Sequence, residues 1–280
     1  MGYIINQAAI EKFQKKMQAE EKSKATIEKY VRDLKTFQEY VGENAVFSKA
    51  TVIAYKQHLI SKYAVASVNS MLAAVNSFFR ENGWYDCIVK TIKVQRETFR
   101  SGEKELTREE YFSLLKAAKQ QENHRLYMLM QTICSTGIRV SELKYITVEA
   151  LHTRRSRVAL KGKIRTVILP LELCRELKKY VRERNIKSGS IFVTGSGRPL
   201  DRSNIWHEMK KLCQEAGVDR EKVFPHNLRH LFACTYYRLE KDITRLADIL
   251  GHSNINTTRI YTMVSGKEQE EQIGKMGLVV

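Results

Sequence analysis

Four short segments in the second half of the chain hold residue types that could act on a phosphodiester. They are residues 136–143 (TGIRVSEL), 154–170 (RRSRVALKGKIRTVILP), 225–230 (PHNLRH) and 250–262 (LGHSNINTTRIYT). Guanidinium groups match phosphate oxygens two at a time and remain protonated, and a tyrosine phenol can attack phosphorus once it has lost its proton. Together these residue types could cleave a phosphodiester through a covalent phosphotyrosine.

The first segment places Arg139 shortly after Gly137, at a predicted helix break, with Leu143 facing the core. A single arginine there is often a surface residue whose stem covers apolar neighbours. Glu142 is interpreted as an acid that orients this arginine, and a solvated surface position is the equally weighted alternative.

In the third segment, a helix that begins at Pro225 puts His226, Arg229 and His230 on one face, because they are three and four residues apart. Free N–H groups at a helix start also favour anions. His226 and His230 have the spacing of a two-histidine metal pair. A zinc hydrolase, however, needs a glutamate where this chain has Asn227, and Arg229 would repel a dication, so no metal site is predicted.

The second segment is expected to form a β-hairpin whose turn at Gly162 is flanked by Lys161 and Lys163. A basic hairpin tip can reach a phosphate backbone, and a charged edge that protects the sheet is the open alternative. The predicted helix 201–216 could enter a major groove or present a solvated basic face. The candidate DNA contacts in these two elements are Arg154, Arg155, Arg157, Lys163, Arg165, Arg202, Asn204, Lys210 and Lys211.

Tyr261 is one of 13 tyrosines, and taken alone it would be read as a core residue. The bulk charge supports a nucleic-acid partner, because the formal net charge is +17 and the pI is near 9.6. The excess is spread over the chain, with 16 basic and 10 acidic residues in 1–100 and 32 and 21 in 101–280. Both parts are therefore expected to hold the polyanion.

Scattered cysteines without a Cys-x-x-Cys pair argue against a zinc ribbon or a disulfide framework. The sequence has neither a signal peptide pattern nor an apolar run of membrane-spanning length, so it predicts a cytoplasmic protein, nucleoid-associated in a bacterium, with no membrane partner.

The elements that must position these residues fall into two parts. Helical spacing of apolar residues predicts a four-helix N-terminal domain over 1–90, with Ser67 as the N-cap of its last helix. A basic linker is expected over 91–105. A mainly α domain with a small antiparallel β-sheet (α+β) follows over 106–264; it includes a capping box at Thr107 and Glu110 and a short strand at 191–193.

The four segments, in this order and at these intervals, resemble the tyrosine recombinases (phage integrase family, Xer-like), and the resemblance covers the whole chain. It implies a SAM-like core-binding domain at the N-terminus and a two-domain clamp on DNA. Arg139, Arg229 and His252 match the residues that stabilise the phosphate, Lys161 matches the hairpin lysine that acts as general acid, and Tyr261 matches the nucleophile. His226 matches the motif histidine and is the candidate proton acceptor.

The resemblance further implies a 3′-phosphotyrosyl intermediate without metal, ATP or other cofactor. The expected partner is double-stranded DNA with inverted-repeat core sites, bound by a homotetramer that is a monomer or weak dimer when free. Residues 265–280 form a C-terminal tail that could dock on a neighbouring protomer or could fray. Two alternatives to a recombinase are a type IB topoisomerase-like enzyme and a catalytically silent DNA-binding regulator.

Overall fold

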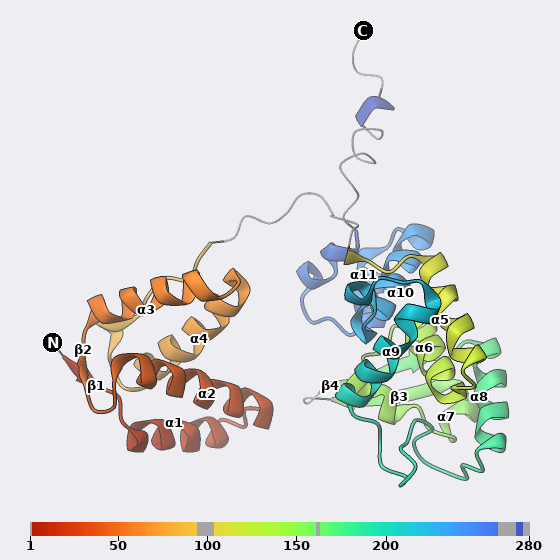
Figure 1. Cartoon of the computed structure of the whole chain (residues 1–280), viewed down its shortest axis with the longest axis horizontal. Coiled ribbons are helices and arrows are strands. Elements are labelled where there is room, and N and C mark those ends of the chain that lie inside the picture. Colours follow the sequence, from red (N-terminus) through yellow and green to blue (C-terminus); the bar gives the residue numbers. More distant parts are fainter. Residues whose placement is uncertain (1, 94–103, 161–162, 263–272, 277–280) are drawn as a thin grey trace. The chain divides into compact units, whose positions relative to one another are not determined.

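The computed structural model describes residues 2–93, 104–160, 163–262 and 273–276. The chain divides into two compact units, Met1–Arg96 and Glu97–Val280, which are described separately (Figure 1). Both are mainly helical, and the sheets are small and antiparallel. The predicted fold class is confirmed.

The N-terminal unit contains four helices, and each carries a stripe of apolar residues that faces the others. They are α1 (Gln7–Ala19), α2 (Lys24–Val41), α3 (Lys49–Lys62) and α4 (Val65–Glu81), followed by the short η1 (Tyr85–Cys87). A two-residue antiparallel pair of β1 (Tyr3–Ile4) and β2 (Val46–Phe47) adds to the expected all-helical unit. The prediction of Ser67 as an N-cap is wrong, because the carbonyl of Ala64 already accepts from the amides of Ser67 and Val68.

Aromatic side chains fill the core of this unit. Phe37 packs edge-on against Phe47 and Phe79, and all three rings are almost fully buried. The buried Asn76 of α4 donates to the carbonyl of Val89 and accepts from its amide, at 2.8 and 3.1 Å. Because this amide pairs with the backbone as a strand would, the chain that leaves the unit is held against α4.

The second unit is built around α6, with short helical turns between its longer elements. Its elements are α5 (Arg108–Gln120), α6 (His124–Thr136), η3 (Val140–Tyr145), α7 (Ala150–Thr153), β3 (Arg155–Leu160), β4 (Lys163–Ile168), α8 (Leu171–Glu183), α9 (Arg202–Ala216), η4 (Arg220–Lys222), α10 (Pro225–Glu240), α11 (Ile243–Leu250), η5 (Ile255–Thr257) and η6 (Arg259–Tyr261). The capping box at Thr107 and Glu110 is formed. Residues 191–193 do not form the expected strand, since Val193 makes a single isolated bridge to Pro199.

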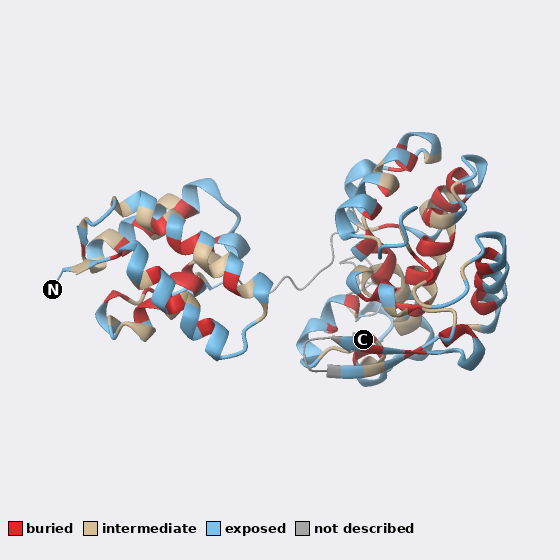
Figure 2. Ribbon diagram, turned by 90° about the horizontal axis from the view of Figure 1, so that it is seen from below, coloured by how far each residue is buried: buried red, intermediate tan, exposed pale blue. Residues whose placement is uncertain are grey.

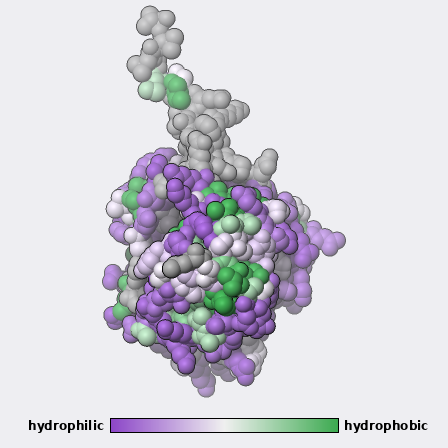
Figure 3. All heavy atoms as spheres, turned by 90° about the vertical axis from the view of Figure 1, so that its left-hand side faces the viewer, coloured by the Kyte–Doolittle hydropathy of each residue, from purple (hydrophilic) through white to green (hydrophobic). Residues whose placement is uncertain are grey.

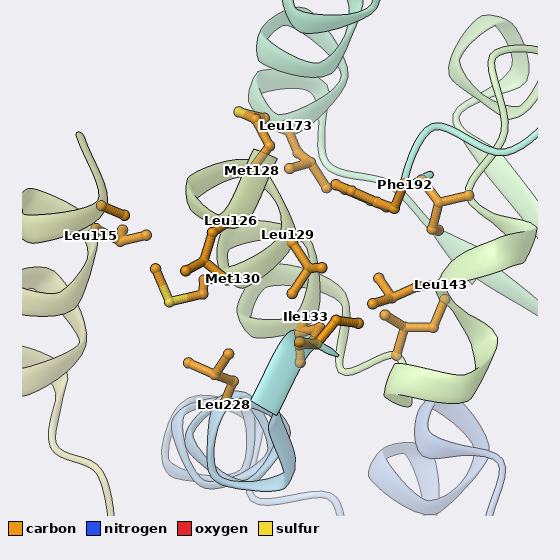
Figure 4. Packing of buried hydrophobic residues seen from close by; sticks show 14 of the residues in the cluster. Leu115, Leu126, Met128, Leu129, Met130, Ile133, Leu143, Leu173, Phe192 and Leu228 are labelled. Carbon is orange, nitrogen blue, oxygen red and sulfur yellow. The ribbon is translucent and has the colours of Figure 1, made fainter. Parts of the chain in front are cut away.

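Packing around α6 fixes the elements that carry the candidate site. Figure 4 shows Leu129 and Ile133 of α6 near Leu143, with Leu228 of α10 and Leu115 of α5 on the other sides of the helix. All of these side chains are buried. α6 therefore joins the segment after Gly137 to α10 through a continuous apolar core.

The hairpin follows strict alternation. β3 and β4 form the expected hairpin, and they pair in register from Arg155 opposite Ile168 to Leu160 opposite Lys163. Val158 and Val167 face the core, and Arg165, opposite Val158, lies on the same face. One arginine of the basic hairpin thus points inward.

Buried residues line the inner faces of the helices in both units (Figure 2). The face shown in Figure 3 is mostly hydrophilic with separate hydrophobic patches. The five cysteines are free thiols, and four of them are buried. Among the described residues, none of the helices is both long and apolar enough to cross a membrane.

Candidate active site

The structure brings Arg139, His226, Arg229, His252 and Tyr261 together from four elements of the second unit. Arg139 follows the end of α6, the two α10 residues face it, His252 follows α11, and Tyr261 ends η6. Lys161 lies outside the described residues, so its predicted place is not described.

Arg229 is the centre of the site and is almost fully buried. Its guanidinium donates to the carbonyls of Gly137 and Leu250, the latter at 2.8 Å, and to Nε2 of His252 at 3.0 Å. Burial and the nearby charge of Arg139 lower the pKa of Arg229 to about 10. The group therefore remains charged at neutral pH and is held rigidly by protein acceptors.

Glu142 holds Arg139 in place. One carboxylate oxygen accepts from Nη1 of Arg139 at 3.0 Å, and the other accepts from its backbone amide at 2.9 Å. Burial favours the neutral acid, but the amide hydrogen bond and the charges of Arg165 and Arg139 outweigh it, so the pKa of Glu142 lies below its usual value. An ionised, buried carboxylate thus orients an arginine that is about one-third exposed.

His252 is an uncharged acceptor in this arrangement. Burial and the charge of Arg229 lower its pKa to about 4, and its Nε2 accepts from Arg229. Its Nδ1 lies 2.9 Å from the hydroxyl of the fully buried Thr258, which assigns the proton to Nδ1. In this structure Nε2 accepts from Arg229, and the expected role of His252 in stabilising the phosphate stays a prediction.

The uncharged state of His252 predicts a pH dependence of stability. Between about pH 4 and the usual histidine value near 6.5, the unfolded chain binds more protons than the folded one, so the free energy of unfolding falls as the pH falls. The free energy of unfolding is expected to decrease by on the order of 1 kcal/mol between pH 6.5 and 4.5, after allowing for solvent screening. Urea unfolding at the two pH values measures it. His252→Gln should flatten the fall, and an unchanged slope in this variant would refute the assignment.

Tyr261 is 3% exposed and packs with Cys234, Leu246 and Leu250. Its ring meets that of His230 edge-on at 5.0 Å between centroids, and the ring of His252 lies 6.2 Å away, nearly parallel. Burial raises the pKa of Tyr261, although the charge and hydrogen bond of Arg229 oppose this. The phenol is therefore protonated at neutral pH, and its use as a nucleophile requires a proton acceptor.

His226 lies beside the arginines in a surface depression of about 390 Å³, whose lining also includes Arg139, Arg202, Trp206 and Arg229. Partial burial and the charge of Arg229 lower the pKa of His226. An uncharged imidazole among cations can take up a proton.

His230 lies on the same face of α10 but has a different partner from His226. Its Nε2 lies 3.1 Å from Glu105, so it does not form the two-histidine metal pair that the spacing allows. Within the described part of the chain, no group of three or more His, Cys, Asp or Glu residues could hold a metal ion.

The candidate DNA contacts differ in how exposed their side chains are. Arg154, Arg155, Arg157, Arg202, Asn204 and Lys211 are exposed. The Lys210 ammonium lies over the ring of Trp206, and both residues line a second depression of about 590 Å³ along α9. The side chain of Lys163 is not described. Arg165 instead donates to Glu142 and to a backbone carbonyl, in contrast to the DNA contact that its basic neighbours suggest.

Three features of the candidate site were not predicted from the sequence. Trp206 is a single aromatic residue on a polar helix face, Thr258 is an ordinary hydroxyl among several, and the partner of Arg165 is 23 residues away. The inward position of Arg165 could have been found, because it alternates with Val167 and Leu169.

Gly137 has a backbone requirement that can be tested. Its φ is +63°, and an added Cβ would lie 2.4 Å from the ring of Phe232. We expect Gly137→Ala to lower the free energy of unfolding by about 2–4 kcal/mol. Gly217 is the matched control, since its φ is +62° but nothing lies within 4 Å of its added Cβ. Gly217→Ala should cost about 1 kcal/mol. Equal losses in urea unfolding would contradict the steric argument.

Comparison with known protein families agrees with this geometry. Residues 104–268 match the phage integrase family, and residues 10–82 match its N-terminal SAM-like domain. The tyrosine recombinase XerA of Thermococcus kodakarensis is 32% identical over 266 residues, which cover 91% of this chain and 90% of the relative. XerA of Pyrococcus furiosus is 29% identical, with 98% and 96% covered.

Solved structures share the fold. A lambda integrase dimer bound to a COC′ core site has a TM-score of 0.75 at 16% identity and covers 95% of this chain and 97% of its own. A lambda integrase tetramer bound to a Holliday junction has a TM-score of 0.72 at 18% identity, with 91% and 76% covered. On the family match and the sequence relatives, the chain belongs to the phage integrase family and is a tyrosine-type site-specific recombinase.

Proposed function

We propose that the protein cleaves and rejoins DNA strands by attack of Tyr261 on a phosphodiester. The bond from the phenolic oxygen to phosphorus forms while the bond to the 5′-oxygen breaks, which leaves a 3′-phosphotyrosyl ester and a free 5′-hydroxyl. The reverse reaction with another 5′-hydroxyl reseals a strand, so the ester conserves the bond and no ATP is needed. The observation that carries this proposal is the position of the Tyr261 ring, nearly parallel to that of His252 at 6.2 Å, while His252 accepts a hydrogen bond from Arg229.

The arginines supply the stabilisation that a pentacoordinate phosphate requires. Negative charge moves onto the equatorial oxygens in the transition state, and Arg139 and Arg229 are fixed cations beside the depression where a phosphate would lie. Their positions are set by protein acceptors, so little reorganisation is needed when charge develops. Together with a protonating lysine, they can act without a metal ion.

Two protons have to move. His226 is our candidate acceptor for the phenolic proton, because it is uncharged and lines the depression, whereas Nε2 of His230 is directed at Glu105. Lys161 is proposed to protonate the departing 5′-oxygen on the basis of its position in the sequence motif. Each step is balanced, since the phenol loses one proton and the leaving oxygen gains one.

The proposed partner is duplex DNA with inverted-repeat core sites, contacted by both domains and bound by four protomers during exchange. Exposed basic residues of β3 and α9 would contact phosphates or bases. The four-protomer complex agrees with the tetrameric lambda integrase structure. A DNA-joining enzyme works in the compartment that holds its DNA, and a cytoplasmic, nucleoid-associated location is proposed on that ground.

The tail 265–280 is proposed to dock on a neighbouring protomer. A groove of about 570 Å³ beside α10 has a mostly charged and polar lining that also includes Leu106, Leu231 and the largely exposed Leu239. Within the tail, Ile273 and Met276 expose more than half of their surface. The apolar side chains of the groove and of the tail are suited to each other.

Trapping on a nicked duplex tests the proposed function. Sites are selected from a randomised pool by binding, and a nick next to the cleavage position lets the short 5′-hydroxyl fragment escape. We expect a covalent protein–DNA species that survives detergent and forms equally well with EDTA. Absence of the species, or its loss with EDTA, would refute the mechanism. Relaxation of any supercoiled plasmid without pairing of two sites would favour the topoisomerase alternative.

A further inference from the structure

Three arginines converge on the carboxyl end of α11. The carbonyl of Ile249 accepts from Arg165 at 2.6 Å, and that of Leu250 accepts from Arg229 at 2.8 Å. The next carbonyl, of Gly251, accepts a longer hydrogen bond from Arg139 at 3.5 Å. The last carbonyls of a helix lack partners within it and carry its negative dipole end, so this end attracts cations.

The remaining carbonyls of this helix end are already used. The amide of Gly251 donates to Ala247 and Asp248, and the amide of His252 donates to Ala247. Because of this left-handed turn, the backbone carbonyls of Ile249, Leu250 and Gly251 remain available to accept hydrogen bonds from the arginines. The helix end therefore collects the two arginines of the active site and one further arginine, Arg165.

Arg165 reaches this point from β4. Its side chain is 15% exposed, and its two terminal nitrogens have separate acceptors. Nη1 donates to the carbonyl of Ile249, and Nη2 donates at 2.6 Å to the same Glu142 oxygen that accepts the Arg139 amide. Arg165 thus shares one carboxylate with Arg139 and one helix end with Arg229.

The backbone at Gly251 gives independent evidence that the fold accommodates the aliphatic stem of Arg165 at this point. Gly251 has a φ of +65°, and an added Cβ would lie 2.5 Å from Cδ of Arg165 and 2.8 Å from its Nε. The glycine turn and the arginine stem are therefore packed against each other, and a side chain at position 251 would displace the Arg165 stem.

We propose that Arg165 is a positioning residue of the recombination reaction, which fixes both catalytic arginines and does not bind DNA. The inference rests on the proposed function. Arg165 acts on Arg139 through Glu142 and on Arg229 and His252 through the end of α11. Without it, Glu142 keeps one cationic partner and the carbonyl of Ile249 loses a charged donor at a half-buried site, so the arginine cluster is no longer held in a single arrangement.

The test separates positioning from DNA contact with two variants and a control. Arg165→Gln removes the charge, and Arg165→Lys keeps a charge beside Glu142 but cannot serve two acceptors. Arg175→Gln is the matched control, because Arg175 lies on α8, is exposed, and is not among the candidate DNA contacts. Adduct formation is measured under single-turnover conditions on nicked duplexes with either a phosphodiester or a neutral methylphosphonate at the cleavage position. DNA affinity and thermal melting are measured alongside.

We expect Arg165→Gln to slow adduct formation on the phosphodiester by about 10–100-fold, with DNA affinity within about threefold of wild type. On the methylphosphonate the same variant should lose less than about fivefold, since there is no phosphate charge for the arginines to neutralise. Arg165→Lys should fall between Arg165→Gln and wild type, and it provides the same comparison if Arg165→Gln melts below the assay temperature. Arg175→Gln should cleave both substrates at close to the wild-type rate.

Equal losses on both substrates would overturn the proposal, as would a fall in affinity that matches the fall in rate. Failure of the proposed function has a different signature. In that case wild type and Tyr261→Phe would give the same result on both substrates, whatever Arg165 does.

Discussion

Tyr261→Phe is expected to abolish covalent capture of DNA, with a loss of at least about 10⁴-fold, because the phenolic oxygen is the proposed attacking atom. The phenyl ring fills the same buried space against Leu246 and Leu250, so the fold should persist. Loss of the phenolic hydroxyl should change the free energy of unfolding by only about 1 kcal/mol. Adduct yield on a nicked duplex and DNA affinity by gel shift measure the two effects.

Tyr236→Phe is the matched control. Tyr236 packs on the same hydrophobic cluster but is not expected to react. It should form adducts at the wild-type rate. If Tyr261→Phe forms adducts as fast as Tyr236→Phe, another residue is the nucleophile.

Arg229→Lys should have the second largest effect, a loss of about 10³-fold in cleavage with DNA affinity within about fivefold of wild type. Arg229 serves the carbonyls of Gly137 and Leu250 as well as His252, and a lysine ammonium on a flexible stem cannot hold this geometry while it also binds a phosphate. The charge is kept, so long-range attraction to DNA survives. Single-turnover cleavage and equilibrium binding on the same duplex separate the two quantities.

Arg238→Lys controls for the substitution itself. Arg238 is on the same helix but is exposed at the groove beside α10. It should cleave normally in a single-turnover assay. Cleavage by Arg229→Lys within tenfold of wild type would show that fixed bidentate geometry is unnecessary.

Local signals in the sequence predicted much of the fold. Gly137 and Gly251 end helices in the left-handed conformation that glycine adopts without strain, and the capping box at Thr107 starts α5. These features depend on neighbouring residues alone. The ordered motifs then identified the family, which one arginine or one tyrosine could not have done.

What the sequence could not predict depends on contacts between distant residues. The acceptor role of His252 follows from the position of Arg229 on another helix. Arg165 of β4 donates to Glu142 of η3, which is distant in the sequence. Residues 191–193 have strand-like composition but lack a neighbouring strand to pair with beyond isolated bridges. In each case the tertiary partner decides the outcome.

The His230–Glu105 pair shows the same limit. His226, Arg229 and His230 share a helix face by spacing, yet His226 opens to the depression while His230 meets Glu105 and the ring of Tyr261. Residues that share one face of a helix can therefore lie in two different environments. Spacing therefore predicted the neighbourhood of the site but not the partner of each imidazole.

Mass spectrometry of the trapped protein–DNA complex tests the central claim most directly. After digestion with protease and nuclease, the account predicts one modified peptide that contains Tyr261, with a nucleotide joined through its 3′-phosphate to the phenolic oxygen. The released strand should carry a 5′-hydroxyl. A nucleotide on any other residue, or a released strand with a 5′-phosphate, would contradict the account.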